Sequence, residues 1–309
     1  MGVNLPWIGY GTDIGASAWY PAGGLSAQPA SRDLLDRTFD ALGRDGVSVV
    51  RLFLLCDARS GVRFDDDGIP VGVDEHVFPD IDALLACAHR HSIGLMPVLL
   101  DFHLCKAGQI INGVQLGGRS QLIADPDART AFVDRVLRPI GERYGDDDAI
   151  VAWDVMNEPE WCLGIGPLAR RRGVGFEVLQ TFLGEAVRCL HESTRHPVTV
   201  GCAATTWLDL VRPLGLDLYQ VHWYERFGWD KLARPVADLG LDDRPVILGE
   251  FPGRRTAVAE VLDVAKRAGY AGALVWSVLG EDQASAYPPD IVTMARAARP
   301  RLPAPGLRN

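Results

Sequence analysis

The sequence predicts an α/β protein, a single (β/α)8 TIM barrel, and three observations lead to this prediction. Eight short runs rich in Val, Ile and Leu lie along the 309 residues, most of them followed by a longer segment with helical periodicity. Both the number of runs and the chain length suit one closed parallel barrel. Polar side chains follow six of the runs, and the first strand-to-helix turn lacks the GxGxxG fingerprint. A doubly wound open sheet is therefore the second choice.

The order of the expected elements can be read directly from these patterns. Strands are expected at residues 7–11, 47–55, 93–103, 150–157, 197–201, 218–224, 246–250 and 273–277. Helices are expected after a Ser31 cap and at residues 77–91, 126–144, 176–192 and 257–268. An acidic turn at residues 65–68 and a long loop at residues 104–125 complete the pattern, and this loop should form part of a cleft wall.

Composition limits the classes of partner. The chain is 48% hydrophobic and 23% charged and contains no linker-like segment, so residues 1–309 are expected to form one catalytic domain. A net charge of −9 argues against a nucleic-acid partner. The chain contains no run of about 18 apolar residues, so no membrane span is predicted. Met1 is not followed by a basic segment and an apolar stretch, so no export signal is recognised. A cytoplasmic enzyme and a mature secreted form both fit, and the oligomeric state stays open.

The six cysteines show neither a CxxC pair nor metal-ligand spacing, so they are predicted to be mainly buried free thiols. Cys56 and Cys105 each fall just beyond a predicted strand, and those two strands are expected to be neighbours. A Cys56–Cys105 disulfide is therefore a secondary hypothesis.

Two glutamates stand at equivalent places in the pattern. Glu158 ends the fourth apolar run and Glu250 ends the seventh, and Pro159 and Pro252 follow them. Proline cannot donate to a strand ladder, which explains why each run stops there. Because the carboxyl ends of parallel barrel strands meet at one mouth, the two carboxylates are expected to converge.

The remaining polar and aromatic residues at the strand ends give this mouth a chemical character. In strand order they are Arg51, His103, Asn157, His222, Tyr224 and Trp276. Two carboxylates beside an arginine, two histidines, a tyrosine and a tryptophan indicate cleavage of a glycosidic bond. This reaction needs one protonated acid and one ionised carboxylate. Glu158, on an apolar strand, is expected to be the acid. Arg51 is expected to keep Glu250 ionised, with a hydrogen bond from Tyr224 fixing its rotamer.

These motifs also carry a family resemblance. Asn-Glu-Pro after strand four, His-x-Tyr after strand six, Gly-Glu-Phe after strand seven and Trp after strand eight resemble the retaining glycoside hydrolases of clan A. The chain is most similar to glycoside hydrolase family 5, the cellulase and mannanase family, over nearly its whole length. The resemblance implies that Glu158 is the acid/base and Glu250 the nucleophile.

The resemblance implies roles for the other residues as well. Asn157 matches the amide that binds the 2-hydroxyl of the sugar, Arg51 the arginine near the nucleophile, and Trp276 the aromatic floor beneath that sugar. His222 and Tyr224 match the strand-six pair. His103 matches a strand-three histidine by position only, because Leu104 and Cys105 replace the usual flanking aromatic residue.

Several residues admit a second interpretation. Arg51 could form a structural ion pair, His103 could bond a loop, and Trp276 could pack the barrel. Trp161, Trp223 and Trp229 lie in predicted loops and are either sugar-stacking platforms or packing residues. Glu160 and Glu225 are expected to be supporting or surface groups. No metal site is predicted, since nothing shows ligand spacing to His222.

The sequence therefore predicts a retaining β-glycoside hydrolase acting on a β-mannan or β-glucan without a cofactor, with its two carboxyl groups about 5 Å apart. Exo action on short oligosaccharides is the alternative, because the loops at residues 104–125 and 164–175 could close one end of the cleft. An inactive carbohydrate-binding barrel and a metal-assisted hydrolase are the other two classes considered.

Overall fold

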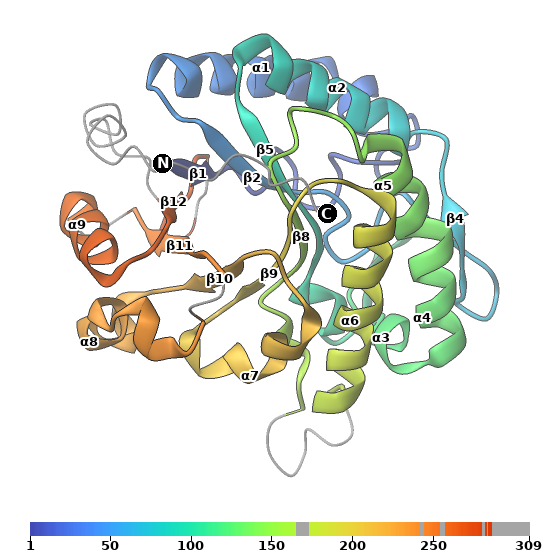
Figure 1. Ribbon diagram of the computed structural model, residues 1–309. Coiled ribbons are helices and arrows are strands. Elements are labelled where there is room, and N and C mark those ends of the chain that lie inside the picture. Colours follow the sequence, from blue (N-terminus) through green and yellow to red (C-terminus); the bar gives the residue numbers. More distant parts are fainter. Residues whose placement is uncertain (165–172, 242–243, 254–256, 280–281, 283, 286–309) are drawn as a thin grey trace.

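The computed structural model describes residues 1–164, 173–241, 244–253, 257–279, 282 and 284–285, and its centre is a closed parallel barrel (Figure 1). Around the barrel the strands follow the order β1, β12, β11, β10, β9, β8, β5, β2. Their bounds are β1 Gly2–Asn4, β2 Val49–Phe53, β5 Gly94–Asp101, β8 Trp153–Asn157, β9 Val198–Cys202, β10 Tyr219–His222, β11 Val246–Pro252 and β12 Gly272–Trp276. The predicted fold class is confirmed, and the open sheet is excluded because β1 pairs with both β2 and β12.

Helices surround the barrel, and short strands and turns lie in the loops that connect its elements (Figure 1). The helices are α1 Pro29–Arg44, α2 Val77–His91, α3 Gln121–Ala124, α4 Pro126–Phe132, α5 Arg138–Tyr144, α6 Phe176–Ser193, α7 Leu208–Val211, α8 Trp229–Ala233 and α9 Val258–Ala268. Two hairpins pair β3 Val62–Phe64 with β4 Pro70–Val73, and β6 Gln109–Ile111 with β7 Val114–Leu116. The single-turn helices used below are η2 Phe102–Cys105, η4 Pro159–Cys162 and η8 Glu225–Phe227.

The predicted first strand at residues 7–11 is wrong, because β1 lies earlier, at Gly2–Asn4. The backbone N–H groups of Ile8 and Gly9 donate to the Asp13 carboxylate at 2.7 and 2.8 Å. These donors therefore serve a turn rather than a ladder. Residues Gly2–Asn4 supply the barrel strand in its place.

Other boundaries differ for identifiable reasons. Pro29 is the first residue of α1, so Ser31 lies inside the helix and is not its cap. The helix predicted at residues 126–144 contains a π-helical segment, η3 Val133–Leu137, just before Pro139, whose missing N–H interrupts the helical ladder. The loop at residues 104–125 contains the β6–β7 hairpin and α3. By contrast, the helix predicted at residues 77–91 is confirmed without change.

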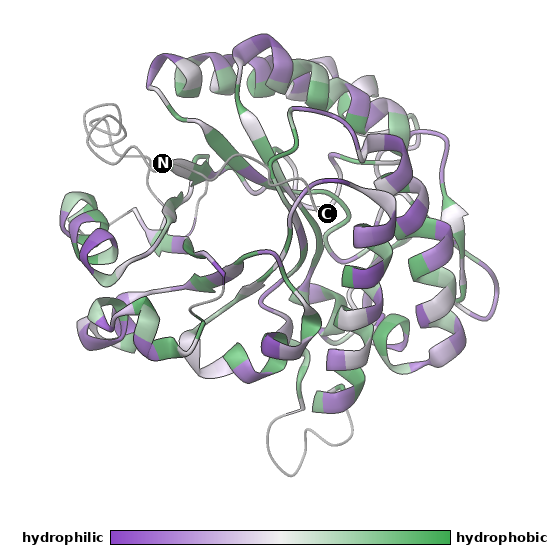
Figure 2. Cartoon of the chain, in the orientation of Figure 1, coloured by the Kyte–Doolittle hydropathy of each residue, from purple (hydrophilic) through white to green (hydrophobic). Residues whose placement is uncertain are grey.

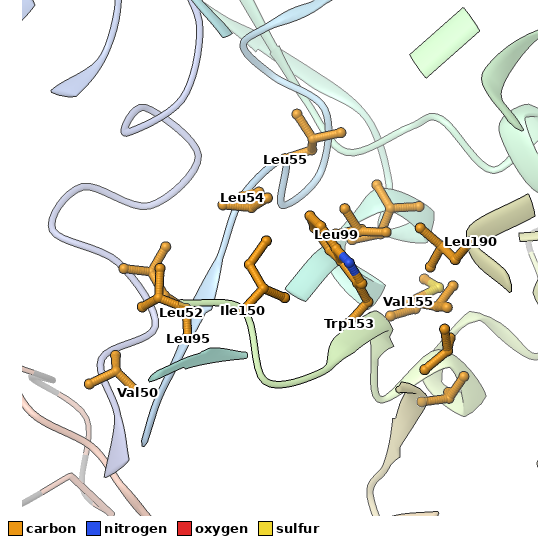
Figure 3. Packing of buried hydrophobic residues seen from close by; sticks show 14 of the residues in the cluster. Val50, Leu52, Leu54, Leu55, Leu95, Leu99, Ile150, Trp153, Val155 and Leu190 are labelled. Carbon is orange, nitrogen blue, oxygen red and sulfur yellow. The ribbon is translucent and has the colours of Figure 1, made fainter. Parts of the chain in front are cut away.

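The core lies between the barrel and its helices. The helices turn their hydrophobic residues toward the sheet and their hydrophilic residues outward (Figure 2). Figure 3 shows one part of this core, where Trp153 is fully buried among Leu99, Ile150, Val155 and Leu190. Burial of these side chains holds β5 and β8 in place, and their carboxyl ends carry residues of the site described below.

Leu99→Ala is expected to lower the free energy of unfolding by about 2–5 kcal/mol, because the side chain is fully buried and the packed surroundings cannot fill the cavity. Denaturant titration measures the change. Val71→Ala is the matched control, since Val71 is 42% exposed and its truncation should change stability by less than about 0.5 kcal/mol. Equal losses in the two variants would contradict this picture of the core.

All six cysteines are free thiols. The Cys56–Cys105 hypothesis is wrong, because Cys105 has Cys162 as its thiol neighbour and Cys56 is buried elsewhere among aromatic and barrel residues. Among the described helices, none combines the length and the hydrophobicity that crossing a membrane requires.

Candidate active site

The carboxyl ends of four strands bring a compact group of polar side chains together. Arg51 comes from β2, Asn157 from β8, His222 from β10 and Glu250 from β11, and Glu158 directly follows β8. Glu158 adopts the left-handed conformation, with φ +46°, while its backbone N–H donates to the Gly201 carbonyl at 2.7 Å. This unusual backbone geometry lies at the point where the strand turns into η4, and it directs the carboxylate into the mouth.

Glu250 is buried and accepts hydrogen bonds at both carboxylate oxygens. Arg51 Nη1 donates to Oε1 at 2.8 Å and the Tyr224 hydroxyl donates to Oε2 at 2.8 Å, as the sequence predicted. Burial raises the pKa of Glu250, whereas His222, Arg51 and Tyr224 oppose that change. Arg51 acts in the expected direction, since it favours the ionised form of Glu250, but burial has the larger effect on this pKa. The guanidinium thereby offsets part of the cost of burying the charge.

Glu158 lies beside Glu250, but none of the arginines and lysines that the structure describes forms an ion pair with it. Its Oε1 lies 2.9 Å from His222 Nδ1, and its Oε2 accepts from the Trp161 indole N–H at 2.8 Å. Burial raises the pKa of Glu158 to about 7, against a lowering effect of the Trp161 hydrogen bond. One carboxylate oxygen of Glu158, one of Glu250 and a ring nitrogen of His222 all lie within 4.8 Å of one another.

His222 links the two carboxyl groups. Its Nδ1 lies 2.9 Å from Glu158 and 3.4 Å from Glu250 Oε2, so Nδ1 carries the proton and donates. Burial lowers the pKa of His222 to about 4, which keeps the ring neutral at pH 7. Gly201 makes room for this arrangement, because a Cβ there would lie 3.1 Å from His222 Nε2 and 3.0 Å from Arg51 Nη2.

Arg51 is the centre of a buried network that the sequence disclosed only in part. Its guanidinium donates to Asp154, Asn4, Asn157 and Glu250 at 2.8–3.0 Å. Sequence reasoning missed Asn4, Asp154 and also Gln220, which donates to Asp154 at 2.7 Å. The signal for Asp154 was its acidic side chain within an otherwise apolar strand. Arg51 therefore forms a buried structural ion pair, and the same ion pair holds Glu250 in the site.

Comparison with known proteins shows which proteins this chain is similar to. No family model matches the chain. A mannan endo-1,4-beta-mannosidase of Mytilus edulis is 25% identical, over 89% of this chain and 82% of the relative. Endo-1,4-beta-mannanase from Eisenia fetida has a similar fold, with a TM-score of 0.77 and 22% identity over 97% of this chain and 90% of that one. A GH5_18 protein from Streptomyces cattleya, solved in complex with Manb1-4GlcNAc, gives a TM-score of 0.64 and 17% identity over 89% of this chain and 78% of that one. The chain is a glycoside hydrolase that resembles the β-mannanases of clan A, family 5.

In this hydrolase an aromatic group lines one side of the mouth. Trp276, at the end of β12, packs near Trp7 and Phe53 with ring centroids 6.3 and 6.4 Å away, and its indole N–H donates to Asp282 at 2.8 Å. His103 lies on η2, not on a strand, where its Nδ1 is 2.6 Å from Asp101 Oδ1. Asp101 is thus a positioning residue that the sequence reasoning missed.

The loop tryptophans of this enzyme differ in their surroundings. Trp161 is 50% exposed and retains a free ring surface. Trp223 is 3% exposed, packs against Trp229 with centroids 4.8 Å apart, and donates to the Gly228 carbonyl. The prediction of Trp223 as a stacking platform is wrong, because both ring faces are covered. Trp229 is 38% exposed.

The two remaining acidic residues near the site, Glu160 and Glu225, also differ in how exposed they are. Glu225 is exposed, whereas Glu160 is only 1% exposed and accepts from the Ala203 N–H. Burial raises the pKa of Glu160 to about 8. Glu160 is therefore a buried supporting group and not a surface residue.

Two groups among the described residues have metal-ligand composition. One is the Glu158, His222, Glu250 set of the mouth, and the other joins Asp36, Cys87 and His91 on α1 and α2. In the second group His91 Nε2 and an Arg90 guanidinium nitrogen both contact Asp36 Oδ1 itself. The aspartate oxygen thus occupies the centre of the group, as in an ion-pair cluster, rather than facing a space that a metal would fill.

Proposed function

We propose that this hydrolase is a retaining endo-β-1,4-mannanase of family 5, in which Glu250 is the nucleophile and Glu158 the acid/base. The observation that carries the proposal is the close approach of the two carboxyl groups, since one oxygen of Glu158 lies within 4.8 Å of one oxygen of Glu250. Among the described residues, an arginine bonds only to Glu250 of these two. A spacing near 5 Å favours a covalent intermediate, whereas inversion needs room for a water between the groups. Residues 1–309 are proposed to act as one catalytic domain.

In the first step Glu250 attacks the anomeric carbon, the bond to the leaving oxygen breaks, and Glu158 gives its proton to that oxygen. Arg51 and Tyr224 each donate a 2.8 Å hydrogen bond to Glu250, and these bonds orient its carboxylate for the attack. Glu158 can be protonated near neutral pH because burial raises its pKa to about 7. Asn157, which accepts from Arg51 Nη2 at 2.9 Å, keeps its amide nitrogen for the sugar 2-hydroxyl.

In the second step Glu158, now ionised, takes a proton from water while the water oxygen attacks the anomeric carbon and Glu250 departs. The sugar leaves with its original anomeric configuration after two displacements. Neutral His222 donates to Glu158 throughout and therefore favours its ionised form without adding a charge to the site.

The choice of substrate rests on the named relatives. The Mytilus edulis and Eisenia fetida proteins are an endo-1,4-beta-mannosidase and an endo-1,4-beta-mannanase by name, which supports β-mannan as the substrate rather than β-glucan. The Streptomyces cattleya complex holds a disaccharide, which supports exo action on short β-mannosides as the second candidate. The 164–175 segment considered for blocking the cleft lies largely outside the described residues.

The deciding experiment is product analysis on β-1,4-mannan and on mannohexaose, beside β-glucan, xylan and aryl β-glycosides. Release of mixed manno-oligosaccharides, with retained configuration by NMR at early times, is expected. Release of monosaccharide alone would replace the endo assignment by the exo one. Absence of turnover on every substrate would contradict the proposed function.

The pH dependence of kcat/KM gives a separate check. Because the first step needs protonated Glu158, whose pKa is about 7, activity should be greatest on the acidic side and fall as pH rises through about 7. Initial rates on mannohexaose between pH 4 and 9 measure this limb. A basic limb that first appears well above pH 8 would show that Glu158 is not the acid.

A further inference from the structure

Trp161 has an arrangement that the proposed mechanism does not yet use. It lies three residues after Glu158, on η4, and donates its indole N–H to Glu158 Oε2 at 2.8 Å. Its side chain is nevertheless 50% exposed. Among the described donors to the two carboxylates, Trp161 is the most exposed, so a bound substrate can cover it.

The two oxygens of Glu158 are held in different ways. Oε1 faces His222, which also reaches Glu250, so this oxygen points toward the nucleophile. Oε2 faces Trp161, whose ring lies 6.4 Å from that of Phe102 on η2. The acid donates to the oxygen of the departing sugar, so that sugar leaves on the Glu158 side of the mouth. Trp161 therefore stands on the leaving-group side.

An indole N–H can donate but cannot accept, so its bond to a carboxylate favours the ionised form. We propose that Trp161 is a positioning residue that favours ionised Glu158 for the second step and, with its exposed ring, forms a platform for the leaving-group sugar. A sugar stacked on this ring shields the hydrogen bond between Trp161 and Glu158 from water. When that sugar departs, water reaches Glu158, which must then act as a base. This inference rests on the proposed function.

Other groups set the charge around Glu158, and the Trp161 variant leaves them unchanged. Among the described residues these groups include Arg51 on β2, Asp101 on β5, Glu160 on η4, His222 on β10, Arg226 on η8 and Glu250 on β11. Cys202 and Tyr224 also face it, and burial raises the pKa of both groups, so they stay neutral. A changed pH profile in a Trp161 variant therefore reports the lost donor.

The first test compares Trp161→Phe with the unaltered enzyme on mannohexaose. Phenylalanine keeps an aromatic face and removes the N–H. Loss of a donor to the ionised form favours protonated Glu158, so the basic limb of kcat/KM should move up by about one pH unit, a tenfold change in the ionisation equilibrium. The position of the limb does not depend on the fraction of folded protein, so partial misfolding cannot mimic this result.

The second test isolates the deglycosylation step. A 2,4-dinitrophenyl β-mannoside releases its phenol without a proton, so Glu158 is needed only as the base. Trp161→Phe should lower kcat on this substrate about threefold to tenfold at pH 5–6, where less Glu158 is ionised. Trp161→Ala should in addition raise KM for mannohexaose, and leave KM for the dinitrophenyl glycoside unchanged, because only the former has sugars on the leaving-group side.

Trp19→Phe is the matched control. Trp19 also donates an indole N–H, but to the Ile111 carbonyl on β6 at 3.0 Å, so its loss should leave the basic limb in place. A limb that stays unshifted in Trp161→Phe would overturn the inference even if Glu158 and Glu250 variants lose activity. Failure of the proposed function is distinguishable, because then the unaltered enzyme would turn over none of the substrates.

Discussion

Glu250→Ala is expected to lower kcat on β-mannan by about 10⁴-fold or more, because a member of a catalytic unit is lost and no other carboxylate can take its place. Arg51 and Tyr224 would then face an empty space where their acceptor had been. Reducing-sugar release and single-turnover rates measure the loss. Melting curves establish that the variant is folded.

Azide rescue separates the roles of the two glutamates. In Glu250→Ala, azide that enters the vacated space should attack an activated β-mannoside once and give the α-azide. In Glu158→Ala, azide should intercept the Glu250 intermediate and give the β-azide. Glu260→Ala, on the exposed side of α9, is the control and should keep full activity. Exchange of the two azide products between the variants would reverse the assignment.

Arg51→Met is expected to lower the free energy of unfolding by about 3–5 kcal/mol, since it leaves buried carboxylates without their cation. The guanidinium is fully buried and its ion pairs with Asp154 and Glu250 measure 2.9 and 2.8 Å. Activity should fall as well, because Glu250 would lose the group that favours its charge. Guanidinium chloride titration and kinetics on mannohexaose measure the two effects.

Arg267→Met provides the comparison for this stability effect. Arg267 pairs with Asp263 one turn away on α9, but its side chain is 65% exposed, so loss of the pair should change stability by less than about 1 kcal/mol. If Arg51→Met were no more destabilising than Arg267→Met, the buried network would not be what holds the mouth together.

The sequence determined the features that depend on local order. Alternation of apolar runs with helical segments gave the barrel, and α2 follows its predicted residues because its periodicity and its flanks agree. The prolines after Glu158 and Glu250 marked strand ends, and parallel strands in a closed sheet must bring their ends to one mouth. The meeting of both glutamates with Arg51, His222 and Tyr224 follows from that geometry.

Only the tertiary structure decided which neighbours each residue acquired across the barrel. β1 moved to Gly2–Asn4 because Asp13 captures the donors of residues 8 and 9 for a turn. Asp154 became a partner of Arg51 because β2 and β8 project into the same interior, a contact that no sequence period specifies. Burial likewise separated Trp223 from Trp161, since a loop tryptophan is a platform or a packing residue according to what the other loops place over it.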